Sequence, residues 1–165
     1  MNLKMAYRVL IIFGIALASI SCDQVTKNWA TETLQAKPPK SYLNNTFRLT
    51  FVKNEGAFLS LGSKLSEKFH YWTLKIFPIV LLIGLLLHML FSKTLTTWQL
   101  IAFSFILGGG VSNIYDRVLY GSVVDFMNMG ISNLRTGIFN FADVSIMTGL
   151  FMMLPTMFSK KPADQ

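Results

Sequence analysis

The sequence contains little charge. Charged residues make up 14% of its 165 positions, whereas a soluble domain carries about 25%. Hydrophobic residues make up 52%, and the mean hydropathy is +0.47. Because so little polar sequence could not cover a soluble core, the composition predicts one domain whose main solvent is a lipid bilayer. Contact with anionic lipid headgroups then explains the net charge of +7 better than nucleic-acid binding does.

Cysteine and histidine are also scarce. A single cysteine, Cys22, excludes an intrachain disulfide, and the two histidines, His70 and His88, have no cysteine partners at zinc-ligand spacing. We therefore expect no metal and no cofactor. The glycine run 108–110 is not followed by the Lys-Ser/Thr of a phosphate-binding loop, so we expect it to permit close helix packing.

Four apolar stretches have about the length of a membrane-spanning helix, at residues 5–22, 71–91, 98–115 and 141–158. We expect a mainly α membrane protein with four transmembrane helices in one domain, residues 1–165. The first stretch follows Lys4 and ends in small residues at Cys22, so it also resembles a cleavable signal peptide. Ser19 stands where a lipidation signal has an aliphatic residue, and we interpret the stretch as a retained helix. Basic residues occur on both sides of the spans, so charge leaves the orientation open.

The segment between the first two stretches is predicted to form a small extramembrane β-cradle at about residues 43–62. Residues 46–53 are rich in β-branched and aromatic types, Asn54-Glu55-Gly56 offers a turn, and residues 57–61 could return as a partner strand. A short loop or helix outside the membrane completes the expected fold. Gly130 and Gly137 lie in a segment that we expect to act as a mobile loop, at about residues 127–139.

Four aspartates lie at the edges of apolar stretches: Asp23, Asp116, Asp125 and Asp143. Ionisable groups are costly at such positions and usually have a function. With four spans, the end of the first, the end of the third and the start of the fourth face the same side of the membrane. The four carboxylates can therefore converge there, close to polar residues that can pair with them, namely Lys27, Asn113, Arg117 and Asn140.

Two of these aspartates have a basic residue nearby. Asp23 stands four residues before Lys27, a spacing that suits an ion pair if the helix continues that far, and Asp116 is followed directly by Arg117. We predict that both are charge-compensated and brace the mouth of a site.

The other two aspartates, Asp125 and Asp143, have apolar neighbours and are predicted to be partly desolvated. Two carboxylates brought together in such surroundings cannot both ionise, so the pair holds one proton. One member can then act as general base and the other as general acid toward a water molecule that attacks a peptide carbonyl. This is the chemistry of an aspartic protease, and it needs no cofactor.

Five motifs follow one another along the chain: Asp23-Gln24-Val25-Thr26-Lys27, Asn54-Glu55-Gly56-Ala57-Phe58, residues 108–117, Val123-Val124-Asp125-Phe126 and Phe139-Asn140-Phe141-Ala142-Asp143. In this order they resemble the motifs of the lipoprotein signal peptidases (signal peptidase II) of bacteria. Each motif alone is weak, but the ordered set covers most of the chain. Two departures occur: Ser112 replaces a frequent glycine, and the second motif is one alanine short after Gly56.

The resemblance implies that Asp125 and Asp143 are the catalytic pair of an aspartic endopeptidase. Its substrate would be a prolipoprotein that carries diacylglycerol on a cysteine, cut just before that cysteine. The enzyme would be a multi-pass protein of the bacterial inner membrane, with both termini cytoplasmic and the site near the periplasmic face. We expect a monomer that contacts substrate and membrane lipids but no nucleic acid. The supporting positions would be Asp23, Lys27, Asn54, Gly56, Asn113, Asp116, Arg117, Asn140 and Ala142.

Two alternatives remain at this point. A small transporter could use the aspartates as proton sites, although its acidic groups would be expected near the bilayer midplane. The chain could also be a lipoprotein that is processed at Cys22.

Overall fold

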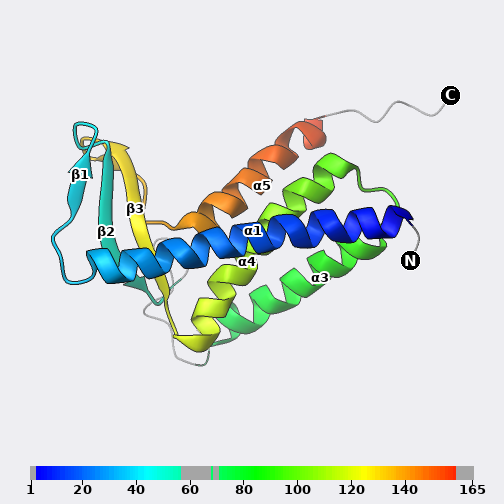
Figure 1. Ribbon diagram of the computed structural model, residues 1–165, viewed down its shortest axis with the longest axis horizontal. Helices are drawn as coiled ribbons and strands as arrows, with labels where there is room; N and C mark the ends of the chain where they lie inside the picture. Colours follow the sequence, from blue (N-terminus) through cyan, green and yellow to red (C-terminus); the bar gives the residue numbers. More distant parts are fainter. Residues whose placement is uncertain (1–2, 57–67, 69–70, 159–165) are drawn as a thin grey trace.

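The computed structural model of the protein describes residues 3–56, 68 and 71–158 (Figure 1). Long helices lie alongside one another, and a small sheet stands at one end of them. In chain order the elements are α1 (Leu3–Leu34), β1 (Lys40–Tyr42), β2 (Phe47–Asn54), η2 (Trp72–Ile76), α3 (Phe77–Phe91), α4 (Thr97–Leu119), β3 (Val123–Ile131), β4 (Leu134–Arg135) and α5 (Phe141–Phe158).

Helix α1 is a single helix of 32 residues that continues well past the first apolar stretch. Its buried residues recur every three or four positions, which places them on one face. That face is apolar at first, polar in the middle and apolar again near the end: Ile12, Ala16, Ser19, Asp23, Lys27, Ala30 and Leu34. The helix runs without a break through Cys22.

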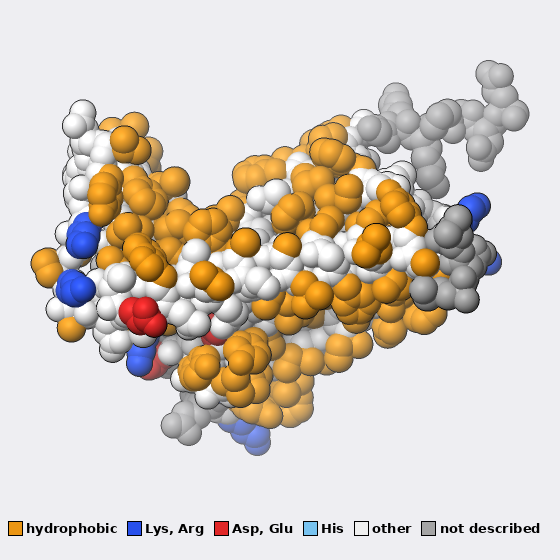
Figure 2. All heavy atoms as spheres, in the orientation of Figure 1, with side chains coloured by type: hydrophobic (Ala, Val, Ile, Leu, Met, Phe, Trp, Pro, Cys, Tyr) orange, Lys and Arg blue, Asp and Glu red, His pale blue; other side chains and the backbone are white. Residues whose placement is uncertain are grey.

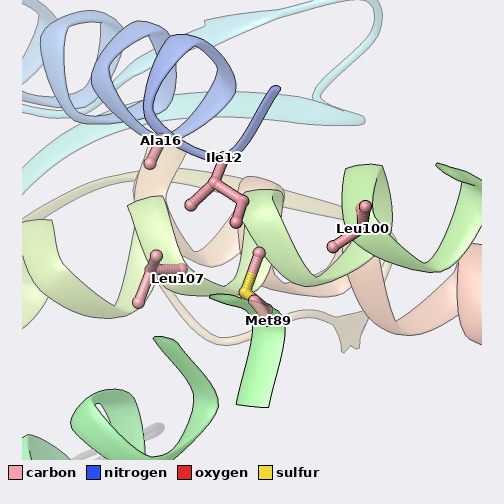
Figure 3. Close-up of a cluster of buried hydrophobic side chains, with 5 residues drawn as sticks. All are labelled: Ile12, Ala16, Met89, Leu100 and Leu107. Atoms are coloured by element: carbon pink, nitrogen blue, oxygen red, sulfur yellow. The ribbon is translucent and has the colours of Figure 1, made fainter. Parts of the chain in front are cut away.

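The helices pack around a small apolar core drawn from α1, α3 and α4 (Figure 3). Ile12 and Ala16 of α1 meet Met89 of α3 and the α4 residues Leu100 and Leu107. Hydrophobic burial of this kind holds the helices together in the half that lies away from the sheet.

Glycines let α4 approach its neighbours closely, as the sequence predicts. A Cβ on Gly108 would come within 2.8 Å of the Ala16 carbonyl oxygen of α1. A Cβ on Gly109 would collide with the carbonyl oxygen of Ala142, at the start of α5. These contacts confirm the helix-packing interpretation of the glycine run, and they bring the N-terminus of α5 against α4.

The sheet is antiparallel, with the strand order β1-β2-β3-β4. Strand β2 occupies the residues that the sequence analysis expects to be extended. Its partners, however, are β1 and β3, and the expected partner at residues 57–61 lies outside the described residues. The β2–β3 register pairs Val52 with Asp125 and Asn54 with Val123, after an irregularity between Leu49 and Val52. The sheet therefore places the end of β2 beside Asp125.

The segment expected to be a loop, residues 127–139, is partly regular. Strand β3 continues to Ile131, a two-residue turn follows, and β4 pairs back with it. Sequence reasoning missed this strand because Asn128 and Gly130 disfavour extended structure, whereas pairing with the distant β2 stabilises it. Motion of this segment stays a prediction.

The helical part has the surface of a membrane protein. The helix from Lys4 to Leu34 and that from Trp72 to Phe91 are long and apolar enough to cross a bilayer, and the apolar helix Phe141–Thr156 is shorter. On the face drawn in Figure 2, hydrophobic side chains cover the middle of the helices, and charged side chains gather toward the two ends. The protein is thus mainly helical, with a small antiparallel sheet and apolar helices that suit a membrane. The number of four spans stays a prediction.

Candidate active site

A buried lysine joins two of the four aspartates. Lys27 Nζ lies 2.6 Å from Asp23 Oδ2 and 2.6 Å from Asp116 Oδ2. All three residues are at most 4% exposed. The i,i+4 pair of Asp23 and Lys27 forms because α1 continues through both residues, as the sequence analysis anticipates. Burial of these charges is tolerated only because they compensate one another.

Asp116 is charge-compensated, as predicted, but its ion-pair partner is Lys27 and not the adjacent Arg117. Consecutive residues on a helix point in different directions. Asp116 instead binds Lys27 and accepts a hydrogen bond of 2.9 Å from Gln24 Nε2. Arg117 Nη2 reaches toward the second motif and donates to the carbonyl oxygen of Gly56, at 3.1 Å.

The other contacts of Asp23 link three helices. Its Oδ2 accepts a hydrogen bond of 2.7 Å from Ser112 Oγ of α4, and its Oδ1 accepts one of 2.7 Å from the backbone N–H of Ala142 in α5. Ser112 also accepts a hydrogen bond from Gln24 Nε2, at 3.0 Å. The serine that departs from the family motif is therefore part of the network, and neither it nor Gln24 was among the predicted site residues.

Asp143 is held by the N-terminus of its own helix. The backbone N–H of Asn140 donates to Asp143 Oδ2 at 3.1 Å, and the backbone N–H of Asp143 donates to Asn140 Oδ1 at 3.0 Å. This reciprocal pattern is a capping box, with Asn140 as the N-cap. Asn113 Nδ2 of α4 donates to the other oxygen of Asp143, at 3.0 Å. Hydrogen bonds to both oxygens of the Asp143 carboxylate therefore fix its orientation.

Asp125 projects from β3 and is held by two asparagine amides. Asn140 Nδ2 donates to its Oδ1 at 2.6 Å, and Asn54 Nδ2 donates to its Oδ2 at 2.8 Å. The side-chain oxygen of Asn54 accepts from the backbone N–H of Gly56 at 3.0 Å, which is the turn chemistry expected after β2. One residue, Asn140, thus contacts both Asp125 and Asp143.

The lysine cluster is joined to the same asparagines. Asn113 Oδ1 accepts hydrogen bonds from Lys27 Nζ at 3.0 Å and from Asn140 Nδ2 at 3.2 Å. The four aspartates therefore converge at one end of the helices, as predicted from topology. The structure brings all of the predicted supporting positions into this one network.

The electrostatics of Asp125 suit a shared proton. Burial raises the pKa of the Asp125 carboxyl to about 6. The hydrogen bond from Asn54 opposes this shift, and the negative charge of Asp143 adds to it. Burial and the charge of Asp143 therefore both favour a protonated Asp125.

An apolar groove of about 680 Å³ between the helices reaches Asp143. Its walls come from η2, α3, α4 and α5, with residues such as Phe77, Leu81 and Ile106. At its polar end lie Asn113, Arg117 and Asp143. The residues that the structure describes contain no group of three or more His, Cys, Asp or Glu side chains arranged to hold a metal ion.

The family model described as signal peptidase (SPase) II matches residues 15–159. The chain belongs to this family. Among curated relatives, a lipoprotein signal peptidase of Acaryochloris marina is 30% identical over 91% of this chain and 90% of its own length. Proteins of the same name from Nostoc punctiforme and Gloeobacter violaceus are 31% and 33% identical, over 90% and 84% of this chain and 90% and 76% of their own lengths.

Solved structures support the same family assignment. One described as a bacterial membrane enzyme at 2.3 Å resolution has a TM-score of 0.76 and 26% identity, covering 96% of this chain and 95% of its own. A second, at 1.9 Å, has a TM-score of 0.76 and 27% identity, over 94% and 95%. Both matches therefore extend over the helices and the sheet of this protein.

Proposed function

We propose that this protein removes signal peptides from prolipoproteins, and that Asp125 and Asp143 are its catalytic pair. The observation that carries the proposal is the joint anchoring of the two carboxyls. Asn140 hydrogen-bonds to both, and Asn54 and Asn113 each fix the remaining oxygen of one. Family membership supports a peptidase, and the geometry supports the aspartic type.

The proton of the pair resides on Asp125, whose pKa is raised to about 6. Asp143, ionised, takes a proton from a water molecule while the water oxygen attacks the scissile carbonyl carbon. Asp125 donates its proton to the carbonyl oxygen, which gives a tetrahedral diol. Asp143 then returns a proton to the leaving nitrogen as the C–N bond breaks, and the diol loses its hydroxyl proton to Asp125. The cycle ends with one proton on the pair, as it began.

The supporting residues orient this pair and its substrate. Lys27 bridges Asp23 and Asp116 and holds Asn113, which in turn directs Asp143. Arg117 lies at the polar end of the groove with one hydrogen bond to the Gly56 carbonyl oxygen. Its remaining N–H groups suit a carbonyl oxygen of an extended peptide.

The substrate is a prolipoprotein whose cysteine carries diacylglycerol, and cleavage occurs just before that cysteine. The support is the composition of the groove, which is apolar over most of its length and polar only beside the pair. Acyl chains and an apolar signal helix would bury their surface there while the scissile bond meets the carboxyls.

The protein is a monomeric, four-span protein of the bacterial inner membrane. The start of α1 and the end of α5 lie at the end of the helices that is remote from the sheet (Figure 1). This arrangement supports cytoplasmic termini and an active site near the periplasmic face. Helix α4, with 23 residues, would be the third span.

A cleavage assay tests the proposal. Purified protein is incubated with a prolipoprotein with and without diacylglycerol on its cysteine, and the products are identified by mass spectrometry. We expect a product that begins at the lipidated cysteine, and only from the modified substrate. An unmodified substrate that is cut equally well would contradict the proposed substrate. Cleavage at another bond would contradict the proposed specificity.

A further inference from the structure

Two hairpin loops meet at one end of the sheet. The β1–β2 loop spans residues 43–46, and the β3–β4 turn is formed by residues 132–133. They are joined by a hydrogen bond of 2.9 Å from the backbone N–H of Gly130 to the Thr46 carbonyl oxygen. The strands run across the helix axes, so this end of the sheet reaches sideways past the helices (Figure 1). We call it the sheet tip, defined by residues 43–46 and 131–134.

The sheet tip exposes large apolar side chains. Leu43 is 77% exposed, Ile131 is 74% exposed and Leu134 is 86% exposed. Leu43 is also one of the few non-glycine residues with a left-handed backbone, at φ 51. A strained backbone that holds a leucine out in solvent indicates a functional contact for that side chain. Figure 2 shows a hollow between this end of the sheet and α5, with hydrophobic side chains on both sides.

Two arginines lie beside the tip on one face of the sheet. Arg48 of β2 is the register partner of Asn128 in β3, and Asn128 Oδ1 accepts a hydrogen bond of 2.6 Å from Arg135 Nε. Asn45 fixes both guanidiniums, because its side-chain oxygen accepts from Arg48 Nε at 2.5 Å and its carbonyl oxygen accepts from Arg135 Nη1 at 2.8 Å. Partial burial lowers the pKa of Arg135, and the positive charge of Arg48 lowers it further.

Arg48 and Arg135 have no carboxylate partner in the part of the chain that the structure describes. Arg135 Nη2 is buried without a hydrogen-bond partner, and the described residues accept no hydrogen bond from the terminal nitrogens of Arg48. Two oriented guanidiniums with unused donors match the oxygens of a phosphate group.

We propose that the sheet tip docks on the bilayer, with Leu43, Ile131 and Leu134 in the interface and the phosphate of a phospholipid headgroup bound between Arg48 and Arg135. Apolar side chains next to arginines are the pattern of an interfacial anchor, because the former enter the acyl boundary and the latter meet the headgroups. An acidic peptide would explain the arginines but not the exposed leucines. Because the tip lies beside the helices, it meets the lipid surface if the helices span the bilayer as proposed.

Docking at the tip would also position the catalytic pair. Strand β2, which carries Arg48, continues to Asn54, and β3, which pairs with Arg135 of β4 through Gly130, carries Asp125. The sheet is therefore one connected piece between headgroup level and the carboxyls. A bound headgroup at one end therefore limits tilting of the sheet at the other.

Lipid retention tests the phosphate site. Full-length protein with Arg48→Gln is compared with wild type, with Arg48→Lys and with the control Lys40→Gln. The control substitution removes an equal charge from an exposed position in β1. Each is extracted from nanodiscs of equal phosphatidylglycerol and phosphatidylcholine, and bound lipid is measured by native mass spectrometry. We expect about fivefold less phosphatidylglycerol on Arg48→Gln, with wild-type levels on Lys40→Gln. Equal loss in both variants would overturn the site.

A second readout tests the tip itself. A nitroxide label at Leu134→Cys, in a Cys22→Ser background, is exposed to a water-soluble relaxant and to oxygen dissolved in the lipid. We expect oxygen to relax the label more strongly, whereas relaxation by the aqueous agent alone would overturn docking. Arg48→Gln could instead leave lipid retention unchanged and raise KM only for substrates with acidic residues after the cleavage point. That result would overturn the lipid site and assign the two arginines to substrate binding. Neither lipid readout depends on peptidase activity.

Discussion

Replacing Lys27 with methionine removes the only cation that contacts the buried carboxylates of Asp23 and Asp116 among the described residues. The substitution keeps a long side chain of similar volume, so the main change is electrostatic. Two ion-pair contacts of 2.6 Å disappear, together with the hydrogen bond of 3.0 Å to Asn113. The buried charge of this cluster changes from −1 to −2.

The size of the effect follows from the donors that remain. Removing one partner of a buried ion pair costs about 3–5 kcal/mol. Asp23 would keep the Ser112 hydroxyl and the Ala142 N–H, and Asp116 would keep Gln24 Nε2. These neutral donors place the expected loss near the lower end, at about 3 kcal/mol. For a chain of this length, such a loss lowers Tm by about 6–12 °C.

Thermal unfolding of the purified protein in detergent, followed by circular dichroism, measures the loss. The matched control is Lys53→Met, because Lys53 lines the same polar cavity as Lys27 but is exposed and makes no salt bridge within the described residues. We expect the control to change stability by no more than about 0.5 kcal/mol. A second variant, Lys27→Met with Asp116→Asn, removes one of the two uncompensated charges and should recover part of the loss.

Two results would refute this reasoning. One is a Tm for Lys27→Met within the range of the Lys53→Met control. The other is a double variant whose loss of stability exceeds the sum of the losses of the two single variants. That result would mean that Lys27 does not compensate Asp116.

The remaining predictions concern the proton and the helix packing. The kcat/KM of cleavage should fall as pH rises above about 6, because Asp125 then releases the proton of the pair. Asn54→Ala removes a hydrogen bond that lowers this pKa, so the falling limb should move to higher pH; a pH profile that is unmoved or moved to lower pH would count against the assignment. Gly109→Ala should destabilise the fold by about 1–3 kcal/mol, because its Cβ would meet the Ala142 carbonyl oxygen. Gly84→Ala, where no atom lies within 4 Å, should be neutral or stabilising by up to about 1 kcal/mol, and equal Tm shifts for both would contradict the packing argument.

The convergence of the aspartates could be predicted because it depends on chain direction and periodicity alone. Helices that alternate in direction bring the end of one to the start of the next, and an i,i+4 spacing places Asp23 beside Lys27. The extended character of β2 was also readable, since β-branched and aromatic residues favour a pleated strand.

The partners of these groups could not be read in the same way. Lys27 and Asp116 are 89 positions apart, and the pairing of β2 with β3 also joins residues that are remote in sequence, such as Phe47 and Met129. Such contacts depend on how the helices pack, which in turn depends on glycines that let α4 approach α1 and α5. The role of Ser112 was hidden for the same reason: its partner Asp23 lies on another helix.

The most direct test of the central proposal is the single-turnover rate of Asp125→Asn and Asp143→Asn on a lipidated prolipoprotein. Each variant is measured beside Glu32→Gln, which makes the same change at an exposed position of α1, and circular dichroism establishes that all three are folded. We predict that each aspartate variant loses about 10³-fold or more in rate, because neither carboxyl alone can hold and exchange the proton, while Glu32→Gln keeps the wild-type rate. A folded Asp125→Asn or Asp143→Asn variant with near-wild-type turnover would contradict the account.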